Sequence, residues 1–230
     1  MSEQGRQAVE VYVEAGLKLS FAGAVEWPGW CRSGRDEAAA CAALLEYAPR
    51  YRAVLKAAGI AFVPEGVPIE LPVVERLRGG SATDFGVPGI TPSADDRPVD
   101  EADLARLLAM LRACWAAFDR AVATSSGVEL RKGPRGGGRD LRAIEAHVVD
   151  GEAGYLSRIA VRAPAVVPGS AESLAADRAV VVAAIAASAH GEVPREGPRG
   201  GRRWSARYFV RRAAWHALDH AWEIEDRSTG

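Results

Sequence analysis

The sequence has few cysteines and almost no net charge. Its 230 residues include only three cysteines, Cys31, Cys41 and Cys114, and no two of them form a CxxC pair. An odd number of scattered cysteines favours reduced thiols in the cytosol over a disulfide framework. The formal net charge is −1, so no excess of one sign favours binding to nucleic acid or to a membrane surface. We therefore predict a cytoplasmic protein with neither nucleic acid nor membrane as a partner.

Long apolar runs and targeting signals are missing as well. The apolar stretch at 179–189 is too short to cross a bilayer, and residues 1–16 lack the basic and apolar segments of a secretory signal. What remains is an ordinary globular composition, with 48% hydrophobic and 26% charged residues. The chain is long enough for one large domain or two small ones.

The first part of the chain begins with the pattern of a β-hairpin. Residues 8–14 alternate between valines and other residues, which predicts a half-buried strand with Glu14 on the face away from the valines. A turn and a second strand over 17–27 complete the predicted hairpin. The segment PGWCRSG at 28–34 is expected to end it, because proline and glycine interrupt regular structure.

A helix over about 36–58 and short strands over 59–77 follow in the prediction. Apolar residues recur at helical spacing in the first of these spans, and Pro49 within it predicts a kink or a division into two shorter helices. Residues 1–80 therefore form a predicted α+β unit. Residues 81–99 are rich in Gly, Pro, Ser and Asp, which predicts a linker or covering loop.

Beyond this linker the pattern is helical throughout. Apolar residues recur at helical spacing in four segments, 101–123, 140–160, 171–190 and 204–226. Asp100 is a candidate N-cap of the first segment. Four amphipathic helices of similar length predict a four-helix bundle over 100–228. The expected fold class is thus α+β overall, with an all-α second part.

Two basic loops of nearly the same sequence precede two of these helices. KGPRGGGRD occupies 132–140 and EGPRGGRRW occupies 196–204. The plainer interpretation is that proline and glycine break helices and that arginine keeps the loops soluble. The alternative is that Arg135 and Arg199 bind an anionic cofactor or substrate group, because the free N–H groups of a helix N-terminus also favour anions. Glycine-rich loops alone do not decide between the two.

A third basic stretch, RYFVRR at 207–212, interleaves arginines with aromatic residues. At helical spacing its arginines are expected to form a solvated face, so the stretch does not predict a nucleic-acid-binding module. Trp215 and Trp222 lie seven residues apart on the same predicted helix, and we expect both to pack in the core.

The positions of the four histidines are the strongest functional signal. His216 and His220 project from one face of the last helix, at the spacing that lets two imidazoles share a metal ion. His147 lies on the apolar stripe of the second helix, and a buried imidazole needs a partner for each nitrogen. Three imidazoles around one metal, with a coordination position left open, are typical of catalytic sites. His190, near the end of the third helix, is instead expected to interact favourably with the helix dipole.

Carboxylates near these histidines are candidates for orienting them or for transferring protons. Glu223 is the only one at helical spacing from both histidines of the last helix, and it is the candidate catalytic residue. The other candidates for bonding to the ligand histidines are Asp150, Glu152 and Asp219.

The histidine in the second helix, together with HALDH in the fourth, resembles the DinB family of metal-binding four-helix bundles. The ligand pattern of that family, one His in helix two and His-x-x-x-His in helix four, falls on His147, His216 and His220. The resemblance covers about 100–228. The family includes mycothiol-dependent maleylpyruvate isomerases, other thiol S-transferases, and hydrolases that inactivate reactive natural products. It therefore implies a metal-dependent enzyme that acts on a reactive small molecule.

Residues 1–80 resemble the HicB-like fold of antitoxins, in which two strands lead to a segment similar to EWPGWCRSGRDEAAACAAL. The resemblance rests on the Pro-Gly pair, on Gly34 six positions after the proline, and on the alanine-rich helix. HicB antitoxins bind a toxin and often carry a DNA-binding tail that is not found here. The resemblance therefore implies a fused accessory unit, either a homodimer contact or a wall of the active-site cleft.

Two reaction classes and one class without catalysis follow from these features. A divalent metal, for which zinc and nickel suit three nitrogen ligands, would activate a low-molecular-weight thiol such as mycothiol for S-transfer or isomerisation. It would alternatively activate water to hydrolyse an electrophilic natural product. The third alternative is a protein that binds a small molecule without turnover. The basic loops suit a carboxylated substrate or thiol, which favours the first class.

Overall fold

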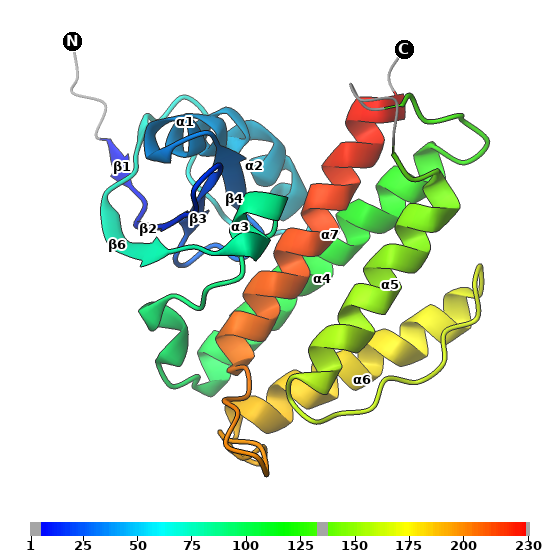
Figure 1. Ribbon diagram of the computed structural model, residues 1–230. Helices are drawn as coiled ribbons and strands as arrows, with labels where there is room; N and C mark the ends of the chain where they lie inside the picture. The colour runs from blue at the N-terminus through cyan, green and yellow to red at the C-terminus, as the bar shows by residue number, and fades with distance from the viewer. Residues whose placement is uncertain (1–5, 133–137, 229–230) are drawn as a thin grey trace. The chain divides into compact units, whose positions relative to one another are not determined.

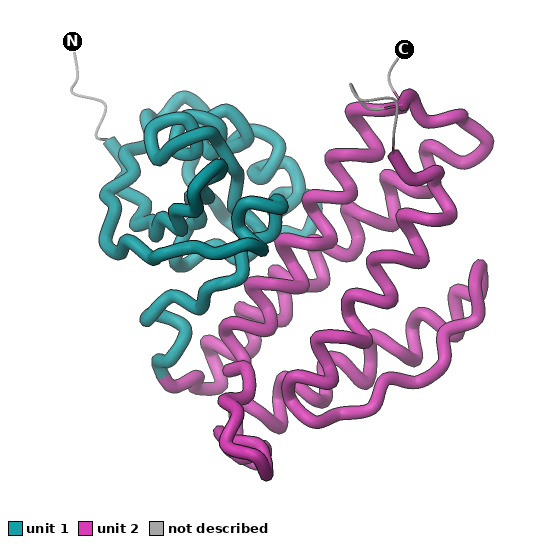
Figure 2. The backbone as a smooth tube through the Cα atoms, in the orientation of Figure 1, with its two compact units in different colours: residues 1–97 teal, residues 98–230 magenta. Residues whose placement is uncertain are grey.

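The computed structural model describes residues 6–132 and 138–228 (Figure 1). The chain divides into two compact units, residues 1–97 and residues 98–230 (Figure 2). Helices and strands are both present, so the mixed α+β content expected from the sequence is confirmed. Within the two described ranges, no helix has the length and the apolar character needed to cross a membrane.

The first unit is built around a four-stranded sheet. β2 (Val11–Ala15) pairs antiparallel with β3 (Ser20–Ala24), which confirms the predicted hairpin. The strand order is β4-β3-β2-β6, in which β4 (Cys31–Gly34) pairs antiparallel with β3 and β6 (Val73–Arg78) pairs parallel with β2. A second, two-stranded sheet joins β1 (Gln7–Ala8) to β5 (Ile69–Glu70).

Two short helices follow β4, as Pro49 predicted. α1 (Glu37–Glu46) begins after Asp36, whose side chain accepts a hydrogen bond from the Ala39 amide, and α2 (Ala48–Ala57) carries the proline in its first turn. The segment 28–34 was expected only to interrupt the hairpin, yet its second half forms β4. Its Pro-Gly pair makes the turn that returns the chain to the sheet, and Trp30 behind it is fully buried.

The face assignment of the first strand was wrong for Glu14. β2 is buried on both faces, and the Glu14 carboxylate is completely inaccessible to solvent. It accepts hydrogen bonds from the Thr83 hydroxyl (2.6 Å) and from the amides of Gly89 (3.0 Å) and Ile90 (2.9 Å). All three donors belong to the segment predicted as a linker, so this carboxylate attaches that segment to the sheet.

The segment at 81–99 consequently has more structure than its composition suggested. It contains the short helix α3 (Ser81–Phe85) and the 3-10 turn η1 (Ser93–Asp96). Both lie in the first unit, which ends at Arg97 rather than near residue 80. Local periodicity could not reveal this, because the segment is held by a distant buried acceptor rather than by its own apolar face.

The second unit consists of four long helices. They are α4 (Glu101–Thr124), α5 (Leu141–Ser157), α6 (Ala171–Ala189) and α7 (Ala206–Ser228), each within a few residues of its predicted range. Asp100, Asp140 and Ser170 cap the first three through their side chains. α7 packs against all three other helices, and α6 also contacts both α4 and α5.

α7 is buried along almost its whole length, which corrects one expectation. Arg207, Arg211 and Arg212 were predicted to form a solvated face, but each is less than 8% exposed. Arg207 donates to the backbone oxygen of Pro98 (3.1 Å) and to the Asp103 carboxylate. Burying an arginine is favourable only where its guanidinium group meets hydrogen-bond acceptors. The tertiary fold decides where these acceptors lie, so helical spacing in the sequence cannot predict it.

A cluster of buried polar side chains lies among α4, α5 and α6. Glu152 on α5 and Asp177 on α6 are 2% and 1% exposed. The indole N–H of Trp115 donates a hydrogen bond to Glu152, while Oδ2 of Asp177 has no partner within the described ranges. Arg178 makes two hydrogen bonds of 2.6 and 2.7 Å to Asp119 instead. Burial raises the pKa of Glu152 to about 7 and also raises the pKa of Asp177.

We expect Glu14→Ala to release the 81–97 segment, because it leaves three donors without their buried acceptor. Hydrogen bonds to a charged group contribute about 1.5–3 kcal/mol each, so the Gly89 and Ile90 amides should lose roughly a hundredfold of their protection from hydrogen exchange. The exposed Glu10→Ala variant, one position before β2, is the control and should keep this protection. Equal protection in both variants would show that other contacts hold the segment.

We also expect Glu152 to make stability depend on pH. The folded protein holds this carboxyl protonated up to a pKa of about 7, above the ordinary value of 4.5. The contribution of this carboxyl to the free energy of unfolding is complete below about pH 4.5 and is lost as the pH rises through 7. Linkage gives a change in the free energy of unfolding of about 3 kcal/mol over this range. Glu152→Gln keeps the acceptor for Trp115 and removes the titration. Urea unfolding from pH 4.5 to 8 should therefore show wild type losing stability relative to this variant.

The control for this measurement is Glu172→Gln, which removes an exposed carboxylate from the first turn of α6. Its unfolding free energy should follow the wild-type pH profile. Parallel profiles for wild type and Glu152→Gln would contradict the assignment of a neutral buried carboxyl.

Candidate metal centre

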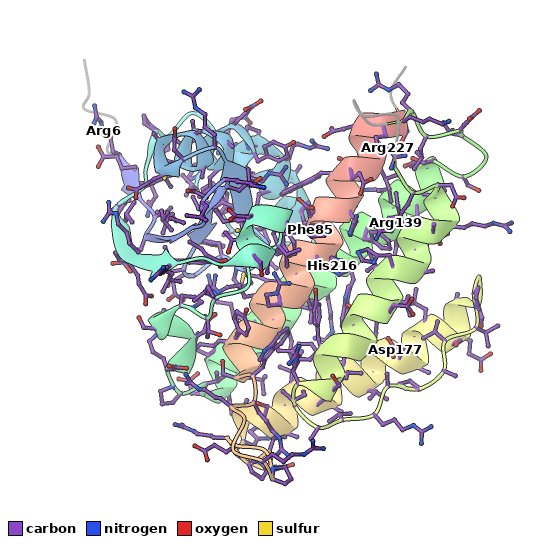
Figure 3. The ribbon with its side chains drawn as sticks, in the orientation of Figure 1. Arg6, Phe85, Arg139, Asp177, His216 and Arg227 are labelled. Carbon is purple, nitrogen blue, oxygen red and sulfur yellow. The ribbon has the colours of Figure 1, made fainter. Side chains whose placement is uncertain are left out.

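Three histidines from α5 and α7 converge in the second unit. His147 lies in the second turn of α5, and His216 and His220 lie one turn apart on α7, where Figure 3 marks His216. The Nε2 atoms of His147 and His216 are 3.3 Å apart, and one nitrogen from each of the three rings lies within 4.8 Å of the other two. The structure thus brings together all three residues that the sequence indicated as metal ligands.

A glycine on α5 allows this convergence. Gly151 lies one turn after His147, and a Cβ atom at Gly151 would lie only 2.5 Å from Cε1 and 2.8 Å from Nδ1 of His216. Non-bonded carbon atoms do not approach so closely, so any larger residue would displace either the His216 ring or the helix. Glycine within a helix costs about 1 kcal/mol relative to alanine, and here the ring occupies the space it leaves.

His220 is oriented by a chain of two further residues on α7. Its Nδ1 donates to Oε2 of Glu223 (2.7 Å), and Oε1 of Glu223 accepts from Arg227 (2.6 Å). Arg227 also donates to the backbone oxygens of Arg131 (2.7 Å) and Arg139 (2.8 Å). Because Nδ1 of His220 is engaged in this way, its Nε2 is the nitrogen that remains for a ligand.

The environment favours the uncharged form of His147 and of His216. Burial lowers the pKa of His216 to about 2, with further contributions from the neighbouring His220 and His147. Burial is also the largest cause of the lowered pKa of His147, followed by the charge of Arg139. In contrast, the hydrogen bond from His220 is the first cause of the lowered pKa of Glu223, which favours its carboxylate form. Neutral imidazole is the form that binds a metal ion.

The separation of two of the three nitrogens matches that expected on a divalent ion. Zinc–nitrogen bonds are about 2.0–2.1 Å long, so two nitrogens on a tetrahedral zinc lie about 3.3 Å apart. The Nε2 atoms of His147 and His216 have this separation, 3.3 Å. Moreover, the buried Nδ1 of His216 has no hydrogen-bond partner among the described residues. The His216 imidazole is therefore incompletely satisfied by the described residues.

An aromatic and cationic wall lies next to the histidines on the same two helices. The ring of Tyr155, one turn after Gly151 on α5, is centred 5.9 Å from that of His216. The buried Arg212 guanidinium lies 5.7 Å from the centre of the Tyr155 ring and 4.7 Å from that of Trp215. Trp215 and Trp222 are both buried, as predicted.

The other residues proposed for the site are less closely associated with the histidines. His190 lies at the C-cap of α6, where it bonds to Glu101 (2.9 Å), so its exclusion from the cluster is confirmed. Glu152 bonds to Trp115 on α4 and does not orient a histidine. The charge of Asp150 offsets part of the lowering of the His147 pKa, which burial dominates. Asp219 lies on α7, next to His220 in the chain.

Arg199 is exposed in the loop that precedes the N-terminus of α7. In the other basic stretch, the backbone oxygen of Arg139 accepts a hydrogen bond from Arg227, near the C-terminus of α7. A helix of this length spans about 34 Å, and His216 and His220 lie at and just beyond its middle. The structure therefore does not bring Arg199 to the histidine cluster. Arg135, the counterpart in the other loop, lies outside the described residues.

Sequence reasoning missed Gly151, Tyr155 and Arg139. Gly151 and Tyr155 follow His147 at intervals of four residues on α5. This spacing places them on the same face of the helix as His147, and it could have identified them. Arg139 directly precedes the α5 cap, and no periodic pattern marks it.

Comparison of the chain with protein-family models, with curated proteins and with solved structures found no match in any of the three.

Proposed function

We propose that the second unit is a DinB-like, metal-dependent enzyme in which His147, His216 and His220 hold one divalent ion. The observation that carries this proposal is the convergence of one nitrogen from each ring to within 4.8 Å of the others. Four long helices, with one of the three histidines on the second and two on the fourth, support a four-helix bundle of this type. Three imidazole ligands suit zinc or nickel.

The residues around the ion have separable roles in this proposal. Glu223 was the candidate catalytic residue, but both of its carboxylate oxygens are engaged, one by His220 and one by Arg227. This supports a positioning role, in which Glu223 fixes the tautomer and orientation of His220. Tyr155 and Arg212 form one side of the site and would limit the access of water to a bound molecule.

We propose that the reaction is thiol-dependent S-transfer or isomerisation of a reactive small molecule, with a low-molecular-weight thiol such as mycothiol as co-substrate. A bound divalent ion supplies Lewis-acid chemistry by lowering the pKa of a thiol or of a water molecule. Neutral ligands leave the full charge of the ion in place, and the charges of Arg212 and Arg139 act on the same site. This positive field supports a thiolate or enolate as the bound species. Hydrolysis and binding without turnover are the alternatives.

The first unit is proposed as a HicB-like accessory unit. Its β2–β3 hairpin, followed by β4 and the alanine-rich α1, supports this assignment. All three candidate ligands lie in the second unit, so the first unit is not required to complete the metal centre. Dimerisation and a contribution to the substrate cleft remain its proposed roles.

We expect protein purified without a histidine tag to contain about one zinc or nickel ion per chain, as measured by elemental analysis. His147→Ala and His216→Ala should each lose the ion, because each removes one of three ligands. Glu223→Gln should retain it with roughly 10- to 100-fold weaker affinity, because only the orientation of His220 is affected. The control His190→Ala should retain it fully. Full metal content in both ligand variants would refute the assignment.

Turnover of an electrophile distinguishes the proposed reaction from its alternatives. Electrophilic small molecules should be converted only when metal and a small thiol are both present, and thiol should alter the visible spectrum of cobalt-loaded protein through sulfur ligation. Turnover that needs metal but no thiol, with a rate that rises near neutral pH, would indicate hydrolysis instead. Protection against unfolding by an unconverted compound, with no product, would indicate a binding protein.

A further inference from the structure

A small cavity of about 290 Å³ lies at the end of α2 in the first unit. Gly59 follows this helix with a φ of 71°, the left-handed conformation that glycine adopts without strain. The amide of Ile60 donates to the backbone oxygen of Leu55 (2.9 Å), which closes the last turn as a Schellman motif. The chain therefore turns back at once, and residues 59–64 line the cavity together with two residues of α2.

Phe62, one of the lining residues, is fixed by three aromatic neighbours. Its ring lies edge-on to those of Trp27, Trp30 and Tyr51, with centroids 4.8, 5.2 and 5.3 Å away. Trp30 and Tyr51 are fully buried, and each donates a hydrogen bond to a backbone oxygen (2.9 and 2.8 Å). This wall of the cavity is thus preformed, so a ligand would have to order few groups on binding.

Arg52 of α2 is held at the cavity by two contacts with the same wall. Its Nε–H donates to the backbone oxygen of Val63 (2.8 Å), and its guanidinium carbon lies 5.9 Å from the centre of the Phe62 ring. The Nε bond fixes the plane of the guanidinium and leaves the N–H groups of its two terminal nitrogens for another acceptor. Lys56 follows one turn later on the same face of α2 and also lines the cavity.

The charges at this cavity all have the same sign. Among the described residues, no carboxylate lines the cavity, and none forms an ion pair with Arg52 or Lys56. In contrast, Arg6 and Arg76 of the same unit each pair with a glutamate (2.7 and 2.8 Å). The other lining residues are Gly59, Ile60, Ala61, Phe62, Val63 and Pro64, none of which has a polar side chain. Two cations beside an apolar wall are complementary to an anionic group with an apolar substituent.

We propose that this cavity binds a small carboxylate with an apolar substituent. Arg52 pairs with the carboxylate, because two parallel N–H groups of a guanidinium match its two oxygens, and Lys56 adds a second charge. The apolar substituent lies against Ile60 and Phe62. The volume of about 290 Å³ is at the small end of ligand pockets and excludes large ligands. The site lies entirely in the first unit, so it does not depend on the proposed metal centre.

The test titrates the full-length, ¹⁵N-labelled protein with three small molecules and follows the amide signals by NMR. Phenylacetate carries both the charge and the apolar group, phenylacetamide lacks the charge, and acetate lacks the ring. Phenylacetate should shift the amides of residues 59–63 and reach saturation. It should bind at least about tenfold more tightly than phenylacetamide, as expected for one hydrogen-bonded pair with a charged group. Acetate should bind more weakly too, because it buries no ring.

Two variants and one control complete the test. Arg52→Gln should reduce the preference for phenylacetate over phenylacetamide to about onefold. Lys56→Gln changes an exposed side chain and leaves the wall intact, so it should weaken phenylacetate binding only about two- to fivefold. Arg78→Gln removes an exposed arginine at the end of β6 and should keep the wild-type preference. Unchanged amide signals outside α2 and residues 59–64 would show that the fold of each variant is intact.

Three outcomes would overturn the proposal. Equal affinity of wild type for phenylacetate and phenylacetamide would show that the cavity does not select a charge. The same preference in wild type and Arg52→Gln would remove Arg52 from the site. Shifts that do not saturate and that spread over basic residues of both units would indicate non-specific binding of anions. None of these outcomes depends on the metal content of the protein, so each leaves the proposed function untouched.

Discussion

The close packing of α5 on α7 at Gly151 is the contact on which the candidate site depends. The His216 ring occupies the space that a Cβ atom would fill. This contact buries the ring, and burial is the main reason that its pKa is lowered to about 2. The same packing brings Nε2 of His216 to 3.3 Å from that of His147. The absence of a side chain at position 151 therefore affects both the position of the His216 ring and its protonation state.

A second constraint comes from Arg227, which connects the loop before α5 to the end of α7. Its guanidinium bonds to Glu223 and to the backbone oxygens of Arg131 and Arg139. One side chain thus fixes the carboxylate that orients His220 and the backbone that carries Arg139. Three consecutive hydrogen bonds connect the Arg139 backbone oxygen to His220, through Arg227 and Glu223. The backbones of Arg131 and Arg139 are in this way connected to the candidate metal site.

The sequence predicted the elements of the second unit well, because each rests on local information. Apolar spacing defined its helices, and the four-residue interval placed His216 and His220 on one face. The partnership of these residues with His147 depended on a resemblance and on the cost of burying an imidazole. Contacts between segments far apart in the chain were harder to predict from the sequence. The alternation of valines with other residues indicated that Glu14 faces solvent. That pattern describes only its own strand and carries no information about Gly89, 75 residues later, whose amide donates to Glu14. Arg139 was missed for the same reason.

α5 also separates two buried polar groups that would otherwise interfere with each other. Gly151 faces His216, whereas Glu152, the next residue, bonds to Trp115 on α4. Successive residues on a helix point about 100° apart, so adjacent positions can serve different neighbours. If Glu152 faced the histidines, its carboxylate would offset part of the charge of a bound ion. In its own cluster it stays protonated up to about pH 7, because burial disfavours its anion. Glu152 therefore would not offset the charge of a divalent ion held by the histidines, which is consistent with the anionic bound species proposed for this site.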